Sequence, residues 1–319
     1  MVREGLRMGE ALRAAVAEAP VADTRYTLRA RYFDSATAFN LHLPPVPAHS
    51  FTDEARAALD AATGTALIAL DLSQAMALDY PATTPLVLAR YGRIRAGETL
   101  VLEAKATVEI YYVIAGAGRS VKGADSIAWA EGDVFALPGG APSEHRAEGG
   151  DAVLWIVTNE PELAFEGAEA PAPERARVEA VHFPAAEIDR RLAVVERKLA
   201  GTRTPGLAVV FSSAAQESRR NISPSLTVAM NQLQPGGSQI PHRHNSVAVS
   251  LPISFERCYS VVDGVRTDWQ PYATTVTPPD SVHSHHNDGA RHGRWLIVQD
   301  GGLHYHCRTM GFAYADPAP

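Results

Sequence analysis

Two short histidine-rich segments constrain the fold of this chain more than any other feature. In 241–245 (Pro-His-Arg-His-Asn), His242 and His244 stand two residues apart, a spacing that puts both side chains on the same face of a β-strand. His283 lies in a second such segment. From a neighbouring strand it would complete three neutral nitrogen ligands for a divalent metal. With a Pro-Gly-Gly turn at 235–237 before the pair, the pattern predicts a small β-barrel with a metal held by His242, His244 and His283.

Length and composition narrow the class of protein. The chain has 319 residues, enough for two domains with a sizeable core. Its hydrophobic content of 46% and charged content of 20% are ordinary for a globular protein. The formal net charge is −7 and no long basic run is present, which argues against a nucleic-acid partner.

Cysteine usage and hydropathy predict the compartment. The two cysteines, Cys258 and Cys307, are too few for a disulfide framework, so free thiols in a reducing cytoplasm are expected. Charges interrupt residues 1–20, which are predicted to form a short amphipathic helix and not a secretory signal. No stretch approaches the roughly 20 apolar residues that cross a bilayer. We therefore expect a soluble cytoplasmic protein without a membrane partner.

The pattern of strands and turns divides the chain into four parts. Residues 1–84 are expected to be a helical and irregular lead-in, with a helix near 53–62. Closely spaced β-runs with glycine punctuation predict a first barrel over 85–165. A Pro/Ala/Glu-rich connector and a helix at 185–200 fill the linker 166–222. A second β-rich block over 223–319 is predicted to be a diverged copy of the first barrel.

The motifs of both blocks resemble those of the cupin superfamily. In the second block these are Pro235-Gly236, the His-x-His pair, Thr277-Pro278 and the segment from His283 to Asn287; in the first they are 109–118 and 131–138. The resemblance implies a mainly β bicupin, with two double-stranded β-helix (jelly-roll) barrels, a helical N-terminal segment and a linking helix. Within the superfamily, the His-Arg-His segment followed by 259–264 (Tyr-Ser-Val-Val-Asp-Gly) is most similar to the gentisate and salicylate 1,2-dioxygenases.

This resemblance implies a cofactor and a reaction. Three histidines leave coordination positions open, which suits Fe(II) with a bidentate hydroxy acid and O2, although the same imidazoles would accept Mn, Ni, Cu or Zn. The implied enzyme is a non-haem iron dioxygenase that opens the ring of gentisate, salicylate or a substituted salicylate between the carbons bearing the carboxylate and the hydroxyl. By analogy, a homo-oligomer (dimer or tetramer) is expected.

The first barrel is predicted to be degenerate and metal-free. Where a cupin would place its histidine pair the chain has 103–105 (Glu-Ala-Lys), and only Glu109 and His145 remain from the usual ligand set. A protonated lysine among would-be ligands repels a cation and cannot ligate. This departs from the gentisate dioxygenases, whose metal generally sits in the first cupin.

Two further residues are predicted to take part in catalysis. His285 stands two residues after His283 and shares its inward face on a continuing strand, from which it could exchange protons with a reactant. Asp300 lies in a segment similar to one in the dioxygenases, where it could orient a metal-bound histidine or a substrate hydroxyl, or form a turn. Beyond it, a strand would place His304 and His306 on one face.

The substrate-binding prediction is Ser246, Arg257, Trp295 and Gln299. Related enzymes carry an arginine for the substrate carboxylate where this chain has Ser250, so Arg257 from the neighbouring hairpin is the proposed replacement. Two other functions stay open on the sequence alone. One is a different metal-dependent cupin enzyme (a decarboxylase, isomerase or lyase) that needs no O2; the other is a non-catalytic bicupin that binds a small ligand.

Overall fold

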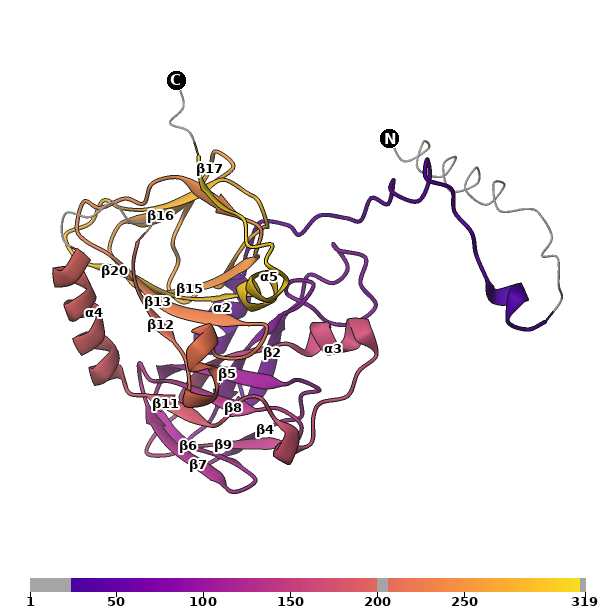
Figure 1. Cartoon of the computed structure of the whole chain (residues 1–319). Helices are drawn as coiled ribbons and strands as arrows, with labels where there is room; N and C mark the ends of the chain where they lie inside the picture. The colour runs from indigo at the N-terminus through magenta and orange to yellow at the C-terminus, as the bar shows by residue number, and fades with distance from the viewer. Residues whose placement is uncertain (1–23, 200–205, 316–319) are drawn as a thin grey trace. The chain divides into compact units, whose positions relative to one another are not determined.

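The computed structural model describes residues 24–199 and 206–315. The chain divides into two compact units, Met1–Pro44 and Pro45–Pro319. In the first unit the described residues form one short 3-10 helix, η1 (Thr27–Arg29), and turns. The helix expected over 1–20 lies outside the described residues. Both barrels belong to the second unit (Figure 1).

The first barrel consists of two antiparallel sheets. Across the larger sheet the order is β11 (Val181–Phe183), β8 (Val134–Pro138), β5 (Val108–Ala115), β10 (Ala152–Thr158), β3 (Leu88–Ile94) and β2 (Ala66–Leu70). The smaller sheet runs β4 (Thr99–Leu102), β9 (Ser143–Ala147), β6 (Ala117–Lys122) and β7 (Asp125–Ala130).

The second barrel repeats this plan. Its larger sheet has the order β1 (His49–Ser50), β18 (Thr275–Thr277), β15 (Ala248–Ser254), β20 (Gly293–Gln299), β13 (Thr227–Leu233) and β12 (Leu207–Phe211). The facing sheet runs β17 (Val265–Asp268), β16 (Cys258–Val262), β19 (His283–Asn287), β14 (His242–His244) and β21 (Phe312–Tyr314).

Helices connect and flank these sheets. They are α2 (Thr52–Leu59), α3 (Glu160–Glu166), α4 (Ala185–Leu199), α5 (Gly301–Cys307) and the 3-10 helices η2 (Pro173–Arg175) and η3 (Ala214–Arg219). Helix α4 confirms the linking helix expected at 185–200, as far as the described residues reach. It has an amphipathic sequence that buries Ile188 and Leu192.

The larger sheets of the two barrels share one hydrophobic core. Ile110 and Tyr112 of the first barrel and Val249 and Leu251 of the second belong to the same buried cluster. Because these sheets are covered on both faces, their central strands are hydrophobic throughout and not alternating; all of Ala152–Thr158 is buried. The second face of each larger sheet is left to line the interior of its own barrel.

The architecture confirms the expected mainly β fold of two barrels with a linking helix, but the edges of the barrels differ from the expected boundaries. Strands β2 and β11 pair with strands of the first barrel, and β1 and β12 pair with strands of the second. Of these, β1 and β2 come from the predicted lead-in 1–84, and β11 and β12 from the predicted linker 166–222. These edge strands are only two to five residues long, too short to show a period in the sequence.

A second difference is at 301–308, where a strand was expected and helix α5 lies instead. A side chain at Gly302 would place its Cβ 2.6 Å from the carbonyl oxygen of Pro224, so glycine lets the helix approach the chain leading into β13. His304 and His306 therefore lie on a helix and do not form the expected strand face.

Candidate metal centre

The structure brings the three predicted histidines together inside the second barrel. His242 and His244 are the two inward residues of β14, and His283 of β19 pairs directly with His242. All three side chains are buried, and each offers a nitrogen such that the three atoms lie within 4.8 Å of one another. The two-residue spacing explains why His242 and His244 share an inward face, and the resemblance to the cupin motifs singled out His283 as their companion.

Backbone carbonyl groups fix the orientation of each ring. The Nδ1 atoms lie 2.8 Å (His242), 2.9 Å (His244) and 2.9 Å (His283) from carbonyl oxygens. These oxygens belong, in the same order, to Ile240, Ser246 and Ser281. A carbonyl oxygen can only accept a hydrogen bond, so each Nδ1 carries the proton and each Nε2 keeps a free lone pair.

The charge state of the rings also suits metal binding. Burial lowers the pKa of His242 and His244, and that of His283 to about 4. The rings are therefore neutral at pH 7 and can ligate without losing a proton. Among the described residues, this group of possible ligands contains no carboxylate. Three nitrogen donors with positions left open fit a divalent transition metal.

A cavity of about 430 Å³ lies beside His244. We call it the His244 cavity. Its walls are mostly apolar, with Val210 and Ile297 on one side and Phe312 on the other. Gln299 projects into it and places its amide nitrogen 3.2 Å from Nε2 of His244. The amide therefore borders the position that a cation on these histidines would take.

The predicted substrate-binding residues are only partly brought together. Ser246 and Gln299 line the His244 cavity. Trp295 is buried in the barrel interior with its ring centroid 4.9 Å from that of His285. Arg257 is exposed and does not line the His244 cavity. Its neighbour Cys258 pairs with Asn287, and Asn287 lies four residues, or roughly 13 Å, along β19 from His283. The structure therefore does not bring Arg257 to the three histidines.

Sequence reasoning missed two cations at the cavity. Arg219 and Arg220 lie at the end of η3 and line the His244 cavity with exposed side chains. Arg220 has a φ of 55°, a left-handed conformation that costs about 1 kcal/mol or more for a residue with a Cβ. An irregular segment has no periodicity, so nothing in the sequence marks these arginines.

The two predicted catalytic residues occupy different surroundings. His285 faces inward, and its Nδ1 lies 2.7 Å from Oγ of Ser260; burial lowers its pKa well below the usual value. Asp300 accepts a hydrogen bond of 2.9 Å from the backbone N–H of Val247. It thus holds the residue after Ser246 and makes no hydrogen bond to the three histidines among the described residues. Burial raises the pKa of Asp300 to about 6.

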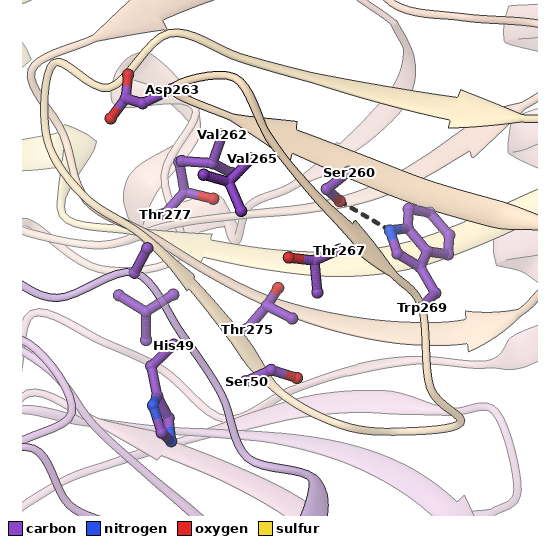
Figure 2. A pocket seen from close by; sticks show the side chains of 12 residues that line it. His49, Ser50, Ser260, Val262, Asp263, Val265, Thr267, Trp269, Thr275 and Thr277 are labelled. Atoms are coloured by element: carbon purple, nitrogen blue, oxygen red, sulfur yellow. Dashed lines mark hydrogen bonds between the residues drawn. The ribbon is translucent and has the colours of Figure 1, made fainter.

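A second cavity, of about 390 Å³, lies at the other edge of the barrel, between β18 and β16–β17. Figure 2 shows it with Trp269 hydrogen bonded to Ser260 at one end and the hydroxyl groups of Thr267 and Thr275 on its walls. We call it the Ser260 cavity. Ser260 lies on its wall and also touches His285, so this residue joins the cavity to the barrel interior.

The first barrel is filled differently from what the sequence suggested. Lys105, expected among the ligand positions, is exposed and pairs with an equally exposed glutamate 2.8 Å away; the inward residues there are Leu102 and Ala104. A different lysine, Lys122, enters the interior and pairs with Glu109 at 2.5 Å, both nearly inaccessible to solvent. Burial raises the pKa of Glu109 in spite of this ammonium group.

The comparisons with known proteins agree with the fold. No family profile matches the chain. It is 32% identical over 119 residues to the 5-aminosalicylate 1,2-dioxygenase of Comamonas sp. That match spans 36% of this chain and about a third (32%) of the length of the relative.

Solved structures match over much more of the chain. The salicylate 1,2-dioxygenase of Pseudaminobacter salicylatoxidans superposes with a TM-score of 0.70 at 12% identity, over 89% of this chain and 92% of that one. A variant of that enzyme reaches 0.71 at 11% identity, over 98% and 97%. At such low identity the superposition establishes the fold, which is that of a bicupin.

The chain thus has the bicupin fold, and its second barrel holds a group of three histidines that could bind a metal. Among known bicupins it resembles the gentisate and salicylate 1,2-dioxygenases. No helix in the described part of the chain is long and apolar enough to span a membrane.

Replacing one inward histidine should abolish metal binding. Loss of a partner that merely orients a ligand costs roughly 10–100-fold in affinity, so His283→Ala, which removes a direct donor, should cost at least that. The matched control is His286→Ala on the outer face of β19, whose ring stacks on Tyr259. Metal content by mass spectrometry after equal dialysis checks this; equal loss in both variants would contradict it.

Asp300→Asn should stabilise the protein at neutral pH. A carboxyl with its pKa raised from 3.8 to about 6 is penalised when ionised in the folded state, so removing the charge should add about 1–3 kcal/mol to the free energy of unfolding at pH 7.5. The gain should shrink as the pH falls below about 6 and vanish near 3.8, where the acid is neutral in both states. Urea unfolding at several pH values measures it, with the exposed Asp280→Asn as control; a gain independent of pH would contradict the assignment.

Proposed function

We propose that this protein is an Fe(II)-dependent dioxygenase that cleaves the aromatic ring of a hydroxybenzoate such as gentisate, salicylate or a substituted salicylate. One observation carries the proposal. Three buried, neutral imidazoles each place a ring nitrogen within 4.8 Å of the others, and one of them, His244, lines a cavity of about 430 Å³. The partial identity to a 5-aminosalicylate 1,2-dioxygenase supports the same reaction class.

The shape and lining of the His244 cavity suit an aromatic acid. Its volume falls in the range of roughly 300–1,000 Å³ common for small-molecule sites. Val210, Ile297 and Phe312 offer apolar surface to a ring, while His244, Gln299 and the two arginines at the end of η3 supply polar and charged groups. An aromatic ring that carries a carboxylate and a hydroxyl matches this lining.

Arg219 and Arg220 are the groups that we propose bind the substrate carboxylate. Neither side chain makes a salt bridge or hydrogen bond within the described residues, and both line the cavity. A guanidinium group can hold a carboxylate with two parallel hydrogen bonds. They would replace the arginine of related enzymes, because that position is Ser250 here, a buried residue without a charge.

In the proposed mechanism, bound Fe(II) supplies open coordination positions and a path for electrons between the ring and O2. The protein's own groups bind and orient. The arginines hold the acid, and the apolar wall keeps water from the ring. The Gln299 amide can contact a polar group of the reactant beside His244, and His285 can hold a proton at its ring nitrogen for an oxygen atom of the reactant.

We further propose a cytoplasmic homo-oligomer. The two cysteines are free, Cys258 buried and Cys307 exposed, as a reducing compartment allows. Several large apolar side chains are exposed in the first unit, including Tyr32 at 79%, Phe39 at 86% and Leu41 at 76%. Apolar surface of this kind is typical of a segment that contacts another chain.

Oxygen uptake by iron-loaded protein tests the function. Anaerobically prepared Fe(II) protein should consume about one O2 per molecule of salicylate, gentisate or 5-aminosalicylate, with loss of the aromatic absorbance, and should not consume O2 with benzoate. Absence of O2 uptake with every hydroxybenzoate would overturn the proposal. Release of CO2 under anaerobic conditions would instead indicate a decarboxylase.

Substitution of the cavity arginines should weaken substrate binding. Hydrogen bonds to charged groups contribute about 1.5–3 kcal/mol, so Arg219→Gln or Arg220→Gln should raise KM for salicylate about 10- to 100-fold with a smaller change in kcat. Salicylamide, which has no carboxylate, should bind the variants and the parent protein alike. Arg257→Gln is the control at the far end of the barrel, and an equal effect there would contradict the assignment.

A further inference from the structure

The same three-residue hydrogen-bond chain occurs in both barrels. In the second barrel Trp269 Nε1 donates to Ser260 Oγ at 2.8 Å, and Ser260 Oγ lies 2.7 Å from His285 Nδ1. In the first barrel Trp129, Ser120 and His145 repeat these contacts at the same 2.8 and 2.7 Å. Both serines pair across strands with their histidine, so the two chains are structurally equivalent.

The direction of hydrogen bonding along this chain determines where the histidine proton sits. An indole N–H only donates, so the serine oxygen accepts from tryptophan. The serine hydroxyl then has its own hydrogen to donate, and within the described residues His285 Nδ1 is the acceptor in reach. With Nδ1 as an acceptor, a neutral His285 carries its proton on Nε2. This is the opposite tautomer to that of the three metal-site histidines.

The first barrel shows what such an Nε2–H binds. His145 Nε2 lies 3.1 Å from Ser143 Oγ and 3.2 Å from the phenolic oxygen of Tyr111, which gives its own hydrogen to Glu109 at 2.7 Å. Both oxygens can accept a hydrogen bond from His145. A phenol is thus one of two hydroxyl partners of this histidine in the first barrel.

The second barrel lacks that phenol and has smaller side chains in the equivalent positions. Tyr111 pairs with Ile156 and Phe135, and Ser250 pairs with Ile297 and Thr275, so Ser250 occupies the place of Tyr111. Two stacked rings, with centroids 4.5 Å apart in the first barrel, are replaced by a serine and a threonine.

Two buried polar atoms of strands β15 and β20 have no hydrogen-bond partner. Ser250 Oγ and Trp295 Nε1 are buried without a hydrogen bond within the described residues. Buried polar groups are almost always hydrogen bonded, so the pair points to a ligand with polar atoms. His285 Nε2 likewise makes no hydrogen bond within the described residues, although Trp295 packs beside its ring.

We propose that Trp269 and Ser260 are positioning residues that keep the proton of His285 on Nε2, so that His285 donates a hydrogen bond to the ring hydroxyl oxygen of a hydroxybenzoate bound in the His244 cavity. That oxygen would take the place that the Tyr111 hydroxyl has in the first barrel. The identity of the ligand rests on the proposed function. The tautomer rests only on contacts within this chain. The two can therefore be tested separately.

Binding to the Zn(II)-loaded protein tests the ligand, because zinc supports no oxygen chemistry. Ser260→Ala and Trp269→Phe should weaken salicylate binding about 3- to 10-fold, the effect of one neutral hydrogen bond, and leave benzoate, which lacks the hydroxyl, unchanged in calorimetry. Ser120→Ala and Trp129→Phe are matched controls that break the same chain in the first barrel and should leave both affinities unchanged. Equal effects of Ser260→Ala and Ser120→Ala on salicylate would overturn the proposal.

The tautomer is measured without any substrate. In ¹⁵N-histidine spectra of the Zn(II) protein, assigned with His285→Asn, His285 should be protonated on Nε2. In Ser260→Ala the two tautomers should mix, while metal content stays unchanged. Protonation of Nδ1 in the parent protein would overturn the positioning role. If the parent protein shows the Nε2 tautomer but binds no hydroxybenzoate, the positioning holds and the proposed function fails.

Discussion

The second barrel depends on the hydrogen bonds that hold three imidazoles in one tautomer. A histidine that enters a barrel interior must give up water, and burial here favours the neutral ring at all three positions. A neutral imidazole still has a donor and an acceptor to satisfy. The backbone carbonyl two residues away takes the Nδ1 proton in each case. This leaves each Nε2 as an acceptor, and among the described residues only that of His244 has a donor, the amide of Gln299. A cation is the group that would satisfy all three at once.

The interiors of the two barrels differ in side-chain size and charge. In the first, Tyr111, Phe135 and the Lys122–Glu109 pair fill the interior. In the second, the places of Tyr111 and Phe135 are Ser250 and Thr275, and the Trp-Ser-His chain is kept. The strand plan and this hydrogen-bond chain are common to both barrels. The first barrel therefore supplies its own ring and its own cation, whereas the second has small hydroxyl side chains and three neutral histidines.

The long central strands of both barrels and the inward histidines could be predicted from the sequence, whereas the edge strands and the loop residues could not. His242, His244 and His283 could be placed because the two-residue period of a strand is strict, and the long strands could be located because they are continuous hydrophobic runs. The edge strands β1, β2, β11 and β12 carry no readable period. The sequence did not place Arg219 and Arg220 at the His244 cavity, and it expected Arg257 there, which does not line it. Residues outside regular elements are positioned by tertiary packing that spacing does not encode. Lys105 was assigned inward although it lies on the outer face of its segment; the residue that matters, Lys122, comes from another strand.

The charge balance of the two interiors limits what the second barrel can bind. In the first barrel the ammonium group of Lys122 and the carboxylate of Glu109, both from this chain, neutralise each other. In the second barrel, a divalent ion on three neutral nitrogens would keep its full charge. Asp300, which follows the cavity residue Gln299, already accepts a hydrogen bond from the backbone N–H of Val247, and burial raises its pKa. Charge buried without a counter-charge is strongly unfavourable. The missing negative charge must therefore come with the ligand, and the arginines at the cavity mouth add further positive charge. An anionic chelating ligand such as an ortho-hydroxy acid satisfies both requirements, whereas a neutral chelator would leave the interior uncompensated.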